Sequence, residues 1–372
     1  MTRNILLAAA VAALELCTAL PAFAQNLIVG RSLPLTGHLK SIGEFKRDGG
    51  DAYIHKVNAS GGIGGKKIEV ITLDDGYVGE TTIANLKKIN SEQKPIAFLG
   101  LLRLPTNGTA LPLLNELKVP FVGISSATDA LRAEYNPYGF PVRAGFAEEA
   151  RKLVNHVKVT SLNRVSLIYQ DVPLGKNIKL HVEAAAKEAS LESVTHELDG
   201  PGSRIAEVAR AVVQDKPQAI FLGTLAPAAV ALIAELRKIP FNGAIYTFSS
   251  TEASMVSKQL GKQAVGIAIS QIVPIPNGPR VKVVAEYLQA MKELGKGSVS
   301  LLGLEAFIEA KVLVEGLRRA GPKASPATLV SALETIRNFD LGGFFVSYSP
   351  QAHTGSLYVE VNVINARGEL IR

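Results

Sequence analysis

The repeated alternation of short apolar runs with amphipathic segments is the feature of this sequence that most limits its fold. Runs such as 68–73 and 96–102 have the length of buried strands and begin or end at glycine, proline or charged residues. Segment 44–59 repeats its apolar residues at the helical period. Short buried strands separated by helices form parallel sheets that are covered on both faces. The sequence therefore predicts an α/β fold.

The predicted elements fall into two series of similar size. The first series contains strands at 27–35, 68–73, 96–102 and 119–124, with helices at 44–59, 81–89 and 111–117. The second contains strands at 165–169, 219–223, 244–248 and 266–272, with helices at 176–188, 204–213 and 227–238. Helices at 281–294, 304–320 and 325–336 and strands at 344–348 and 357–363 follow. Two such series predict two lobes, with a ligand between them at the carboxyl ends of the strands.

Residues 1–24 have the parts of a secretory signal peptide. Arg3 supplies a positive start, 5–14 form a short apolar run, and the segment ends in small residues at Ala24. Glu15 interrupts the apolar run well short of the roughly 20 residues that a membrane-spanning helix needs. We therefore expect cleavage after Ala24 and export to the periplasm.

The cysteine content limits the chemistry of the exported chain. Its one cysteine, Cys17, lies in the predicted signal peptide. The mature chain would then have no disulfide, no thiolate metal site and no cysteine nucleophile. A core large enough for two lobes must stabilise it instead.

The positive charge of the chain is dispersed. The formal net charge is +7, and the basic residues occur as short pairs such as Lys87-Lys88 and Arg318-Arg319. Nucleic-acid binding needs a basic stripe interleaved with stacking aromatic side chains, and the sequence has none. We expect a solvated basic surface, and a mild attraction for anionic solutes is the alternative.

The motifs that could indicate catalysis or metal binding each lack a required residue. The glycine-rich run 61–67 lacks the first glycine of a phosphate loop, where Ser60 stands, and the hydroxyl residue after its lysine, where Lys67 stands. Asp74 and Asp75 have no third ligand at metal-binding spacing, so capping of a strand end is the better interpretation. The six histidines are scattered, and no nucleophile elbow occurs. We therefore expect neither an enzyme nor a bound metal or cofactor.

Small polar residues do follow two neighbouring predicted strands. Segment 102–108 lies between a strand and a helix, and segment 124–129 repeats the arrangement one unit later. Hydroxyls and free backbone N–H groups at the start of a helix can bind a carboxylate. Simple helix capping by Thr106 or Ser126 is the alternative.

Several segments, taken in order, resemble the branched-chain amino acid (Leu/Ile/Val) binding family of periplasmic solute receptors, which serve ABC transporters. The resemblance covers nearly all of the mature chain. It is carried by 32–37 (Ser-Leu-Pro-Leu-Thr-Gly), 58–68, Asp74-Asp75, 167–171 with Leu174-Gly175, and 306–321.

The resemblance implies the type I periplasmic binding fold, in which two Rossmann-like lobes close on a ligand about a hinge of three crossovers. The crossovers are expected near Arg143, Ile272 and Gly343. The first lobe would then comprise 25–143 and 273–343, and the second 144–272 and 344–372. No cofactor is implied. The expected partners are a small-molecule carboxylate and an ABC permease at the inner membrane, and the chain is expected to be a monomer.

The resemblance also implies a set of ligand-binding residues. In the first lobe, the ligand carboxylate would be held by the two polar loops, with Arg103 as an electrostatic partner. Those first-lobe residues are Arg103, Leu104, Pro105, Thr106, Ser125, Ser126 and Ala127. The second lobe would contribute Leu174, Leu225, Ala226, Phe248 and Ser249.

The second lobe departs from the family pattern at the position of Ser249. Amino-acid binders carry an acidic residue there for the ligand ammonium, and a buried ammonium without such a partner costs several kcal/mol. At the two positions where the family has aromatic residues in the second lobe, this chain has Leu174 and Ala226. We therefore expect an organic acid without an amine, such as an aromatic or α-keto acid. Glu252 is close enough in sequence to substitute, which leaves branched-chain or other amino acids as the alternative ligands.

A function of another class also fits the sequence. A sensory receptor with the same fold would bind its ligand in the same way but present it to a membrane kinase or chemoreceptor. A DNA-binding regulator of this architecture would need an N-terminal helix-turn-helix, where this chain has the predicted signal peptide.

Overall fold

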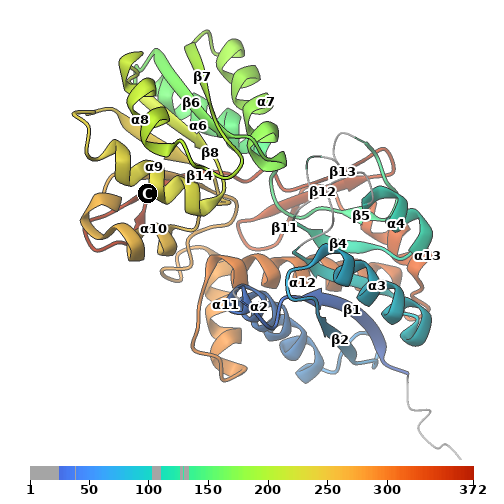
Figure 1. Ribbon diagram of the computed structural model, residues 1–372. Helices are drawn as coiled ribbons and strands as arrows, with labels where there is room; N and C mark the ends of the chain where they lie inside the picture. The colour runs from blue at the N-terminus through green and yellow to red at the C-terminus, as the bar shows by residue number, and fades with distance from the viewer. Residues whose placement is uncertain (1–24, 38, 103–109, 126–128, 130–133) are drawn as a thin grey trace, which may run out of the picture.

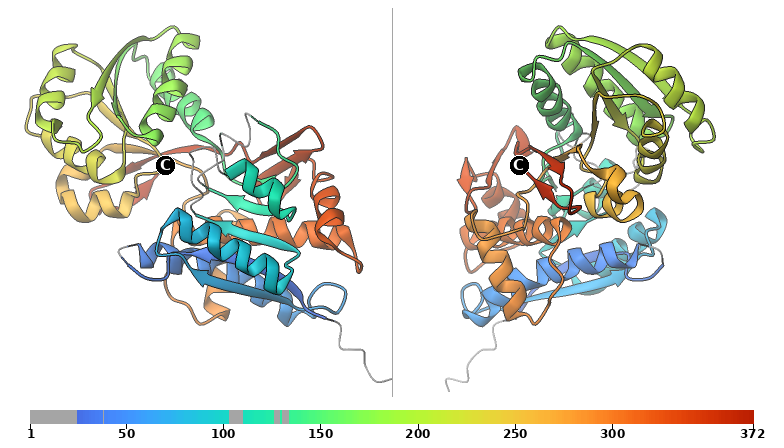
Figure 2. Two further views of the ribbon diagram at one scale, coloured as in Figure 1. Left: turned by 45° about the vertical axis from the view of Figure 1, so that its right-hand side comes forward. Right: turned by 90° about the vertical axis from the view of Figure 1, so that its left-hand side faces the viewer.

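The computed structural model describes residues 25–37, 39–102, 110–125, 129 and 134–372. It contains two lobes built on separate sheets (Figure 1). The first lobe combines the N-terminal segment, blue in Figure 2, with the orange segment from the last third of the chain, and the second holds the green and yellow segments. The strands of both lobes alternate with helices along the chain, so the predicted α/β fold is confirmed.

The first lobe is built on a parallel sheet in the order β2-β1-β3-β4-β5. Its strands are β1 (Leu27–Leu33), β2 (Ile68–Asp74), β3 (Ala97–Leu101), β4 (Phe121–Ile124) and β5 (Gly139–Phe140). Its helices are α2 (Lys40–Ala59), α3 (Gly79–Gln93), α4 (Ala110–Leu117), α11 (Lys282–Glu293), α12 (Leu301–Ala320) and α13 (Pro326–Leu333).

Successive residues of the central strands enter two separate cores of this lobe. Phe98 and Phe121 pack with α3 and α4, whereas Leu99 and Val122 pack with α2, α11 and α12. This division follows from the two-residue period of a strand, which points successive side chains to opposite faces. It explains why strands buried on both faces are continuously apolar in sequence.

Helices α2 and α12 approach each other closely at two glycines. A Cβ on Gly49 would overlap the backbone carbonyl of Gly303, and a Cβ on Gly303 would overlap the hydroxyl of Tyr287. Close contact of the two helix backbones brings the side chains that flank these glycines together. The position of α2 on α12 therefore depends on the absence of a side chain at Gly49, and the packing of α11 against α12 on the absence of one at Gly303.

The second lobe is built on a mixed sheet in the order β15-β14-β10-β9-β8-β6-β7. Its strands are β6 (Arg164–Gln170), β7 (Glu192–Leu198), β8 (Ala219–Gly223), β9 (Ala244–Thr247), β10 (Ile267–Gln271), β14 (Glu360–Ile364) and β15 (Leu370–Ile371). Its helices are α6 (Phe146–Val159), α7 (Pro173–Glu188), α8 (Ile205–Gln214), α9 (Ala226–Leu236) and α10 (Ala253–Leu260), followed by the short 3₁₀ helix Gly261–Ala264. Helices α6 and α7 cover one face of the sheet, and α8, α9 and α10 cover the other.

The chain passes between the lobes three times. Arg143 lies between β5 and α6, and Ile272 follows β10 directly. The third passage differs from the prediction near Gly343. A three-stranded antiparallel sheet, with β11 (Phe339–Asp340), β12 (Phe345–Ser349) and β13 (Ala352–Gly355), follows α13. The buried side chains of Phe344, Val346 and Tyr348 belong to the first-lobe core, so the chain enters the second sheet only at β14.

Two of the crossovers lie against each other. The backbone N–H of Ser356 donates to the carbonyl of Val142 at 2.9 Å, and the Tyr348 hydroxyl donates to the carbonyl of Pro141 at 3.0 Å. The first and third connections are thus paired by hydrogen bonds. Within the described residues, no helix combines the length and hydrophobicity that a membrane span requires.

The glycine contact between α2 and α12 can be tested with neighbouring glycines. We expect Gly49→Ala to lower the free energy of unfolding by about 1–3 kcal/mol, because the new methyl group meets backbone that cannot move aside. Gly50→Ala is the matched control, since its Cβ would meet the end of the Arg31 side chain at 3.3 Å and the Ala306 carbonyl at an ordinary contact distance of 3.7 Å. Urea denaturation of the mature chain compares the two, and equal losses would contradict the proposed contact.

Candidate functional site

The carboxyl ends of the two sheets are joined by a continuous chain of polar contacts. Ser125 follows β4, and its Oγ donates to Glu305 Oε1 on α12 at 3.2 Å. Arg143 Nη1 lies 4.0 Å from the same oxygen. Arg143 Nη2 donates to Ser249 Oγ, which follows β9, at 2.8 Å. The strand ends predicted to bind the ligand therefore approach each other through Arg143, a residue of the first crossover.

A buried ion cluster lies on the first-lobe side of this chain. The side chain of Lys46 on α2 is 1% exposed, and its Nζ lies 3.0 Å from Glu309 Oε1 and 3.7 Å from Glu305 Oε1. It also donates to Ser125 Oγ at 3.2 Å. The hydroxyl of Ser125 is thus engaged on both sides, because it accepts from Lys46 and donates to Glu305.

The two glutamates of this cluster differ in protonation. Burial opposes ionisation of Glu305, but the nearby Lys46 and Arg143, with the Ser125 hydrogen bond, lower its pKa overall. Burial raises the pKa of Glu309 to about 8, despite the attraction of Lys46, and the charge of Glu305 adds to the rise. For Lys46, burial opposes the charge, yet Glu305 and Glu309 raise its pKa. The cluster therefore contains an ionised Lys46–Glu305 pair beside a carboxyl that favours its protonated form at neutral pH.

A second buried carboxyl lies on the other side of Arg143. Glu149 on α6 is fully buried and accepts hydrogen bonds from the Ser249 backbone at 2.9 Å, Ser249 Oγ at 2.8 Å and Ser270 Oγ at 2.6 Å. Arg143 Nη2 lies 3.4 Å from its Oε1. Burial raises the pKa of Glu149 above its usual value, although Arg143 and these hydrogen bonds act in the opposite direction.

The loop after Ser125 also contacts the second lobe. Asp129 accepts hydrogen bonds from the Asn177 side chain on α7 at 2.9 Å and from the Phe146 backbone at the start of α6 at 3.3 Å. Leu174 lies in the first turn of α7, one helical turn before Asn177. The contact thus brings Asp129 close to the helical turn that carries Leu174, a predicted second-lobe residue.

The remaining second-lobe residues differ in exposure. Leu225 is 43% exposed, and its backbone N–H donates to Gln170 Oε1 at 3.0 Å. Ala226 begins α9. Phe248 is fully buried and packs edge-on against Phe146, so its ring is part of the core behind Ser249. The predicted residues Arg103, Leu104, Pro105, Thr106, Ser126 and Ala127 lie outside the described residues.

The sequence prediction missed the buried charges of the site. Lys46, Glu305 and Glu309 lay within predicted helices without an assigned role, and Glu149 lay outside every predicted element. A signal was present on α12, because Glu305 and Glu309 are four residues apart in an otherwise apolar segment and share one helix face. Charged residues on a buried face indicate a paired cluster.

Asp74 and Asp75 hold the loop that follows β2. Asp74 accepts hydrogen bonds from the Leu35 backbone at 2.7 Å and the Thr36 hydroxyl at 2.6 Å, and Asp75 accepts one from the Ser32 hydroxyl at 2.9 Å. No group of three or more potential metal ligands occurs in the part of the chain that the structure describes.

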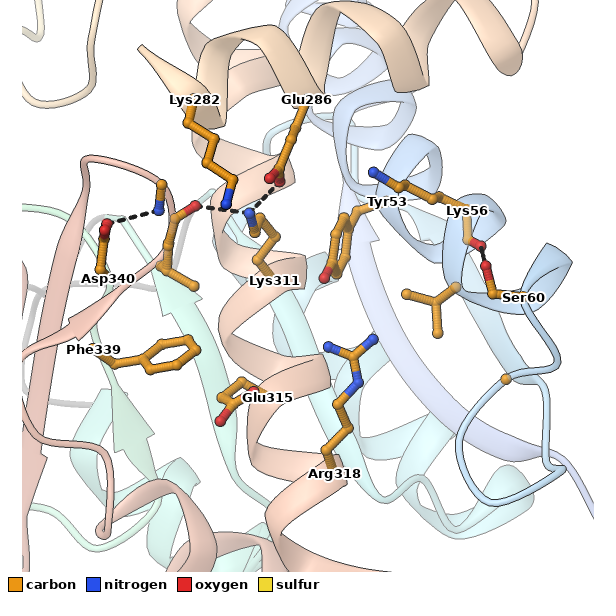
Figure 3. A pocket seen from close by; sticks show the side chains of 14 residues that line it. Tyr53, Lys56, Ser60, Lys282, Glu286, Lys311, Glu315, Arg318, Phe339 and Asp340 are labelled. Carbon is orange, nitrogen blue, oxygen red and sulfur yellow. Dashed lines mark hydrogen bonds and ion pairs between the residues drawn. The ribbon is translucent and has the colours of Figure 1, made fainter.

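A cavity of about 410 Å³ lies elsewhere on the first lobe, between α2, α11, α12 and β11 (Figure 3). Several of its charged residues already have partners: Lys311 contacts Glu286 and the Leu341 carbonyl, and Asp340 accepts from the Gly342 backbone. The cavity is lined by helix faces and a short edge strand, not by the carboxyl ends of the main sheet. Ligands of open α/β sheets bind at those ends, so the Ser125–Ser249 region is the better candidate.

The pairing of Lys46 can be tested against an exposed lysine of the same lobe. Lys46→Met leaves Glu305 without its nearest cation, and we expect it to cost about 3–5 kcal/mol of unfolding free energy. Lys87→Met breaks the exposed Lys87–Glu116 pair and should cost less than about 1 kcal/mol. Urea denaturation measures both, and a small loss in Lys46→Met would show that burial of this cluster does not depend on pairing.

Comparison with known proteins agrees with this two-lobed arrangement. A model of the periplasmic binding protein family matches residues 27–368. The solved structure of an extracellular ligand-binding receptor from Verminephrobacter eiseniae is 28% identical, with a TM-score of 0.81 over 93% of this chain and 100% of that chain. A substrate-binding periplasmic protein from Ralstonia solanacearum is 27% identical, with a TM-score of 0.81 over 93% and 99%.

A curated relative, Leu/Ile/Val-binding protein homolog 7 of Brucella abortus (strain 2308), is 26% identical over 198 residues. The match covers 51% of this chain and 49% of that protein, so the chain spans about half the length of the curated relatives it matches. The family model and the two solved structures, by contrast, extend over nearly the whole described chain, and they confirm the predicted two-lobed fold. This chain belongs to the periplasmic binding protein family.

Proposed function

We propose that this protein is the exported, periplasmic solute-binding receptor of an ABC importer, and that it binds a small carboxylate between its lobes by hinge closure. The preferred ligand is an aromatic or α-keto acid. Membership of the periplasmic binding protein family supports the binding role. Delivery to an inner-membrane permease is the step that would follow release of the ligand.

The ligand preference rests on the carboxyl group of Glu149, which lies beside Ser249 and is already hydrogen-bonded. An α-amino acid needs an acceptor for its ammonium at this strand end, because an unpaired buried ammonium costs several kcal/mol. The nearest acid, Glu149, already accepts hydrogen bonds from Ser249 and Ser270 and lies beside Arg143. Glu149 is therefore already engaged and is not available as an acceptor for an ammonium, which favours an anion without an amine.

The proposed contacts follow the two strand ends. In the first lobe, the loops that contain Thr106 and Ser125 would hold the ligand carboxylate. In the second lobe, Leu174, Leu225 and Ala226 would contact its apolar part, with Ser249 at the polar end. The exposed side chain of Leu225 supports an apolar contact of this kind, because its burial by a ligand would stabilise the closed form.

An amino-acid ligand is the second candidate, and one residue favours it. Glu252 precedes α10, three residues after Ser249, and the hydrogen bond from Ser254 at 3.3 Å is a weak one. Burial raises the pKa of Glu252, and an ammonium placed beside it would restore the ionised form. The relatives named Leu/Ile/Val-binding protein homolog 7 add to this candidate.

A thermal-shift panel distinguishes a keto- or aromatic-acid ligand from an amino-acid ligand. The mature protein is unfolded and refolded to remove carried-over solute, and leucine, valine and phenylalanine are compared with their keto acids and with benzoates. A ligand at 100 times its dissociation constant adds about 2.7 kcal/mol, which raises the unfolding midpoint by several degrees. We expect such shifts from the keto or aromatic acids alone.

The variant Glu252→Gln provides the control for this panel. It removes the proposed ammonium partner while preserving the shape of the side chain. Keto acids should raise the unfolding midpoint of the variant as much as they raise that of the parent protein. A shift by leucine that disappears in Glu252→Gln would overturn the proposed ligand class and identify an amino-acid receptor.

A further inference from the structure

We propose that Glu309 holds a proton that makes the site receptive to an anion, so that a carboxylate binds together with this proton at alkaline pH. The inference rests on the proposed carboxylate function, and it adds the residue that sets the charge of the site. The proton would distinguish an anionic ligand from a zwitterionic one, because an amino acid brings its own positive charge.

The charges around the two strand ends are unbalanced. Among the residues that the structure describes there, two cations, Lys46 and Arg143, face three carboxyl groups, those of Glu149, Glu305 and Glu309. The cluster is therefore negative unless one carboxyl is protonated. All five side chains are buried or nearly so, with Arg143 the most exposed at 16%. Charges interact strongly where water is excluded, so an arriving carboxylate would be repelled by the negative cluster.

Hydrogen bonding identifies Glu309 as the carboxyl that holds the proton. Glu149 accepts three hydrogen bonds from Ser249 and Ser270 beside Arg143, and Glu305 accepts one from Ser125 between Lys46 and Arg143. Glu309 accepts from Lys46 at Oε1, and its buried Oε2 has no hydrogen-bond partner among the described residues. A buried carboxylate oxygen without a donor favours the neutral acid.

The surroundings of Glu309 leave little room for further donors. The strands β3 and β4 meet its carboxyl group at Gly100 and Gly123, both at positive φ. A Cβ on Gly100 would lie 3.0 Å from Oε2, and a Cβ on Gly123 would overlap the carboxyl carbon. Within the described part of the chain, the charges that act on Glu309 are Lys46 from α2, Glu305 from its own helix and Arg143 from the crossover.

The proton on Glu309 is coupled to the predicted ligand loop through Lys46. This one ammonium group contacts both Glu309 Oε1 and Ser125 Oγ. When Glu309 loses its proton, Lys46 faces a second carboxylate. The negative charge of Glu309 then offsets the attraction that Lys46 exerts on an anion beside Ser125. Since the pKa of Glu309 is raised to about 8, Glu309 would lose this proton above neutral pH.

Isothermal titration calorimetry of the mature protein tests this coupling with a matched pair of probes. 4-Methyl-2-oxopentanoate and leucine share a carbon skeleton and differ in the keto and amino groups. Titrations at about pH 9 in two buffers of different ionisation enthalpy count the protons taken up. We expect the keto acid to take up nearly one proton at about pH 9 and its affinity to fall about tenfold from pH 7 to pH 9.

Two glutamine variants on α12 separate the role of Glu309 from a structural one. Glu309→Gln fixes the neutral form, so proton uptake and the fall in affinity should both disappear. Glu315→Gln is the matched control, because Glu315 pairs with Arg319 away from the cluster and its loss should leave the pH profile of the parent protein. Should Glu309→Gln fail to fold, proton uptake by the parent protein remains the test.

The outcomes distinguish this inference from the proposed function. Keto-acid binding without proton uptake overturns the inference and leaves the carboxylate receptor intact. Uptake that persists in Glu309→Gln and disappears in Glu149→Gln also overturns the inference, because the proton then belongs to the other buried acid. Binding of leucine but of no keto or aromatic acid overturns the proposed function and this inference with it.

Discussion

The burial of Lys46 between Glu305 and Glu309 is the interaction on which the rest of the site depends. A charge removed from water costs several kcal/mol unless it is paired, and Lys46 is almost completely enclosed. The helices α2 and α12 must therefore remain in contact, and Gly49 and Gly303 allow the close approach. Because Glu305 also accepts from Ser125 and lies beside Arg143, the same pair positions the end of β4 and the first crossover.

The buried acids of the two lobes differ in the hydrogen bonds that their surroundings supply. Glu149 in the second lobe is surrounded by hydroxyl and backbone donors, which stabilise its charge. Glu309 in the first lobe is packed against Gly100 and Gly123, which offer no side chain. Burial raises the pKa of both acids, but hydrogen bonds from Ser249 and Ser270 oppose the rise at Glu149, whereas Glu309 accepts only from Lys46 among the described residues.

The sequence predicted the strands that are buried on both faces, because they are apolar throughout. It missed some elements that have many exposed or polar residues. Strands such as β3 and β8 are apolar throughout and were located closely. Strand β7 was missed, because it is an edge strand with mostly exposed polar residues. Helix α6 was also missed, although Ala150, Leu153, Val154 and Val157 repeat at helical spacing. For the site, sequence patterns indicated the strand ends, but which charges meet there depends on contacts such as Lys46–Glu309, separated by hundreds of residues.

The pairing of β10 with β14 has a consequence for how the chain acquires its structure. The central strands of the second sheet come from the middle of the chain, but β14 and β15 come from its last residues. During synthesis from the N-terminus, the hydrogen-bonding edge of β10 must wait unpaired until residues 360–364 have emerged. The second lobe therefore cannot be completed on a partly made chain.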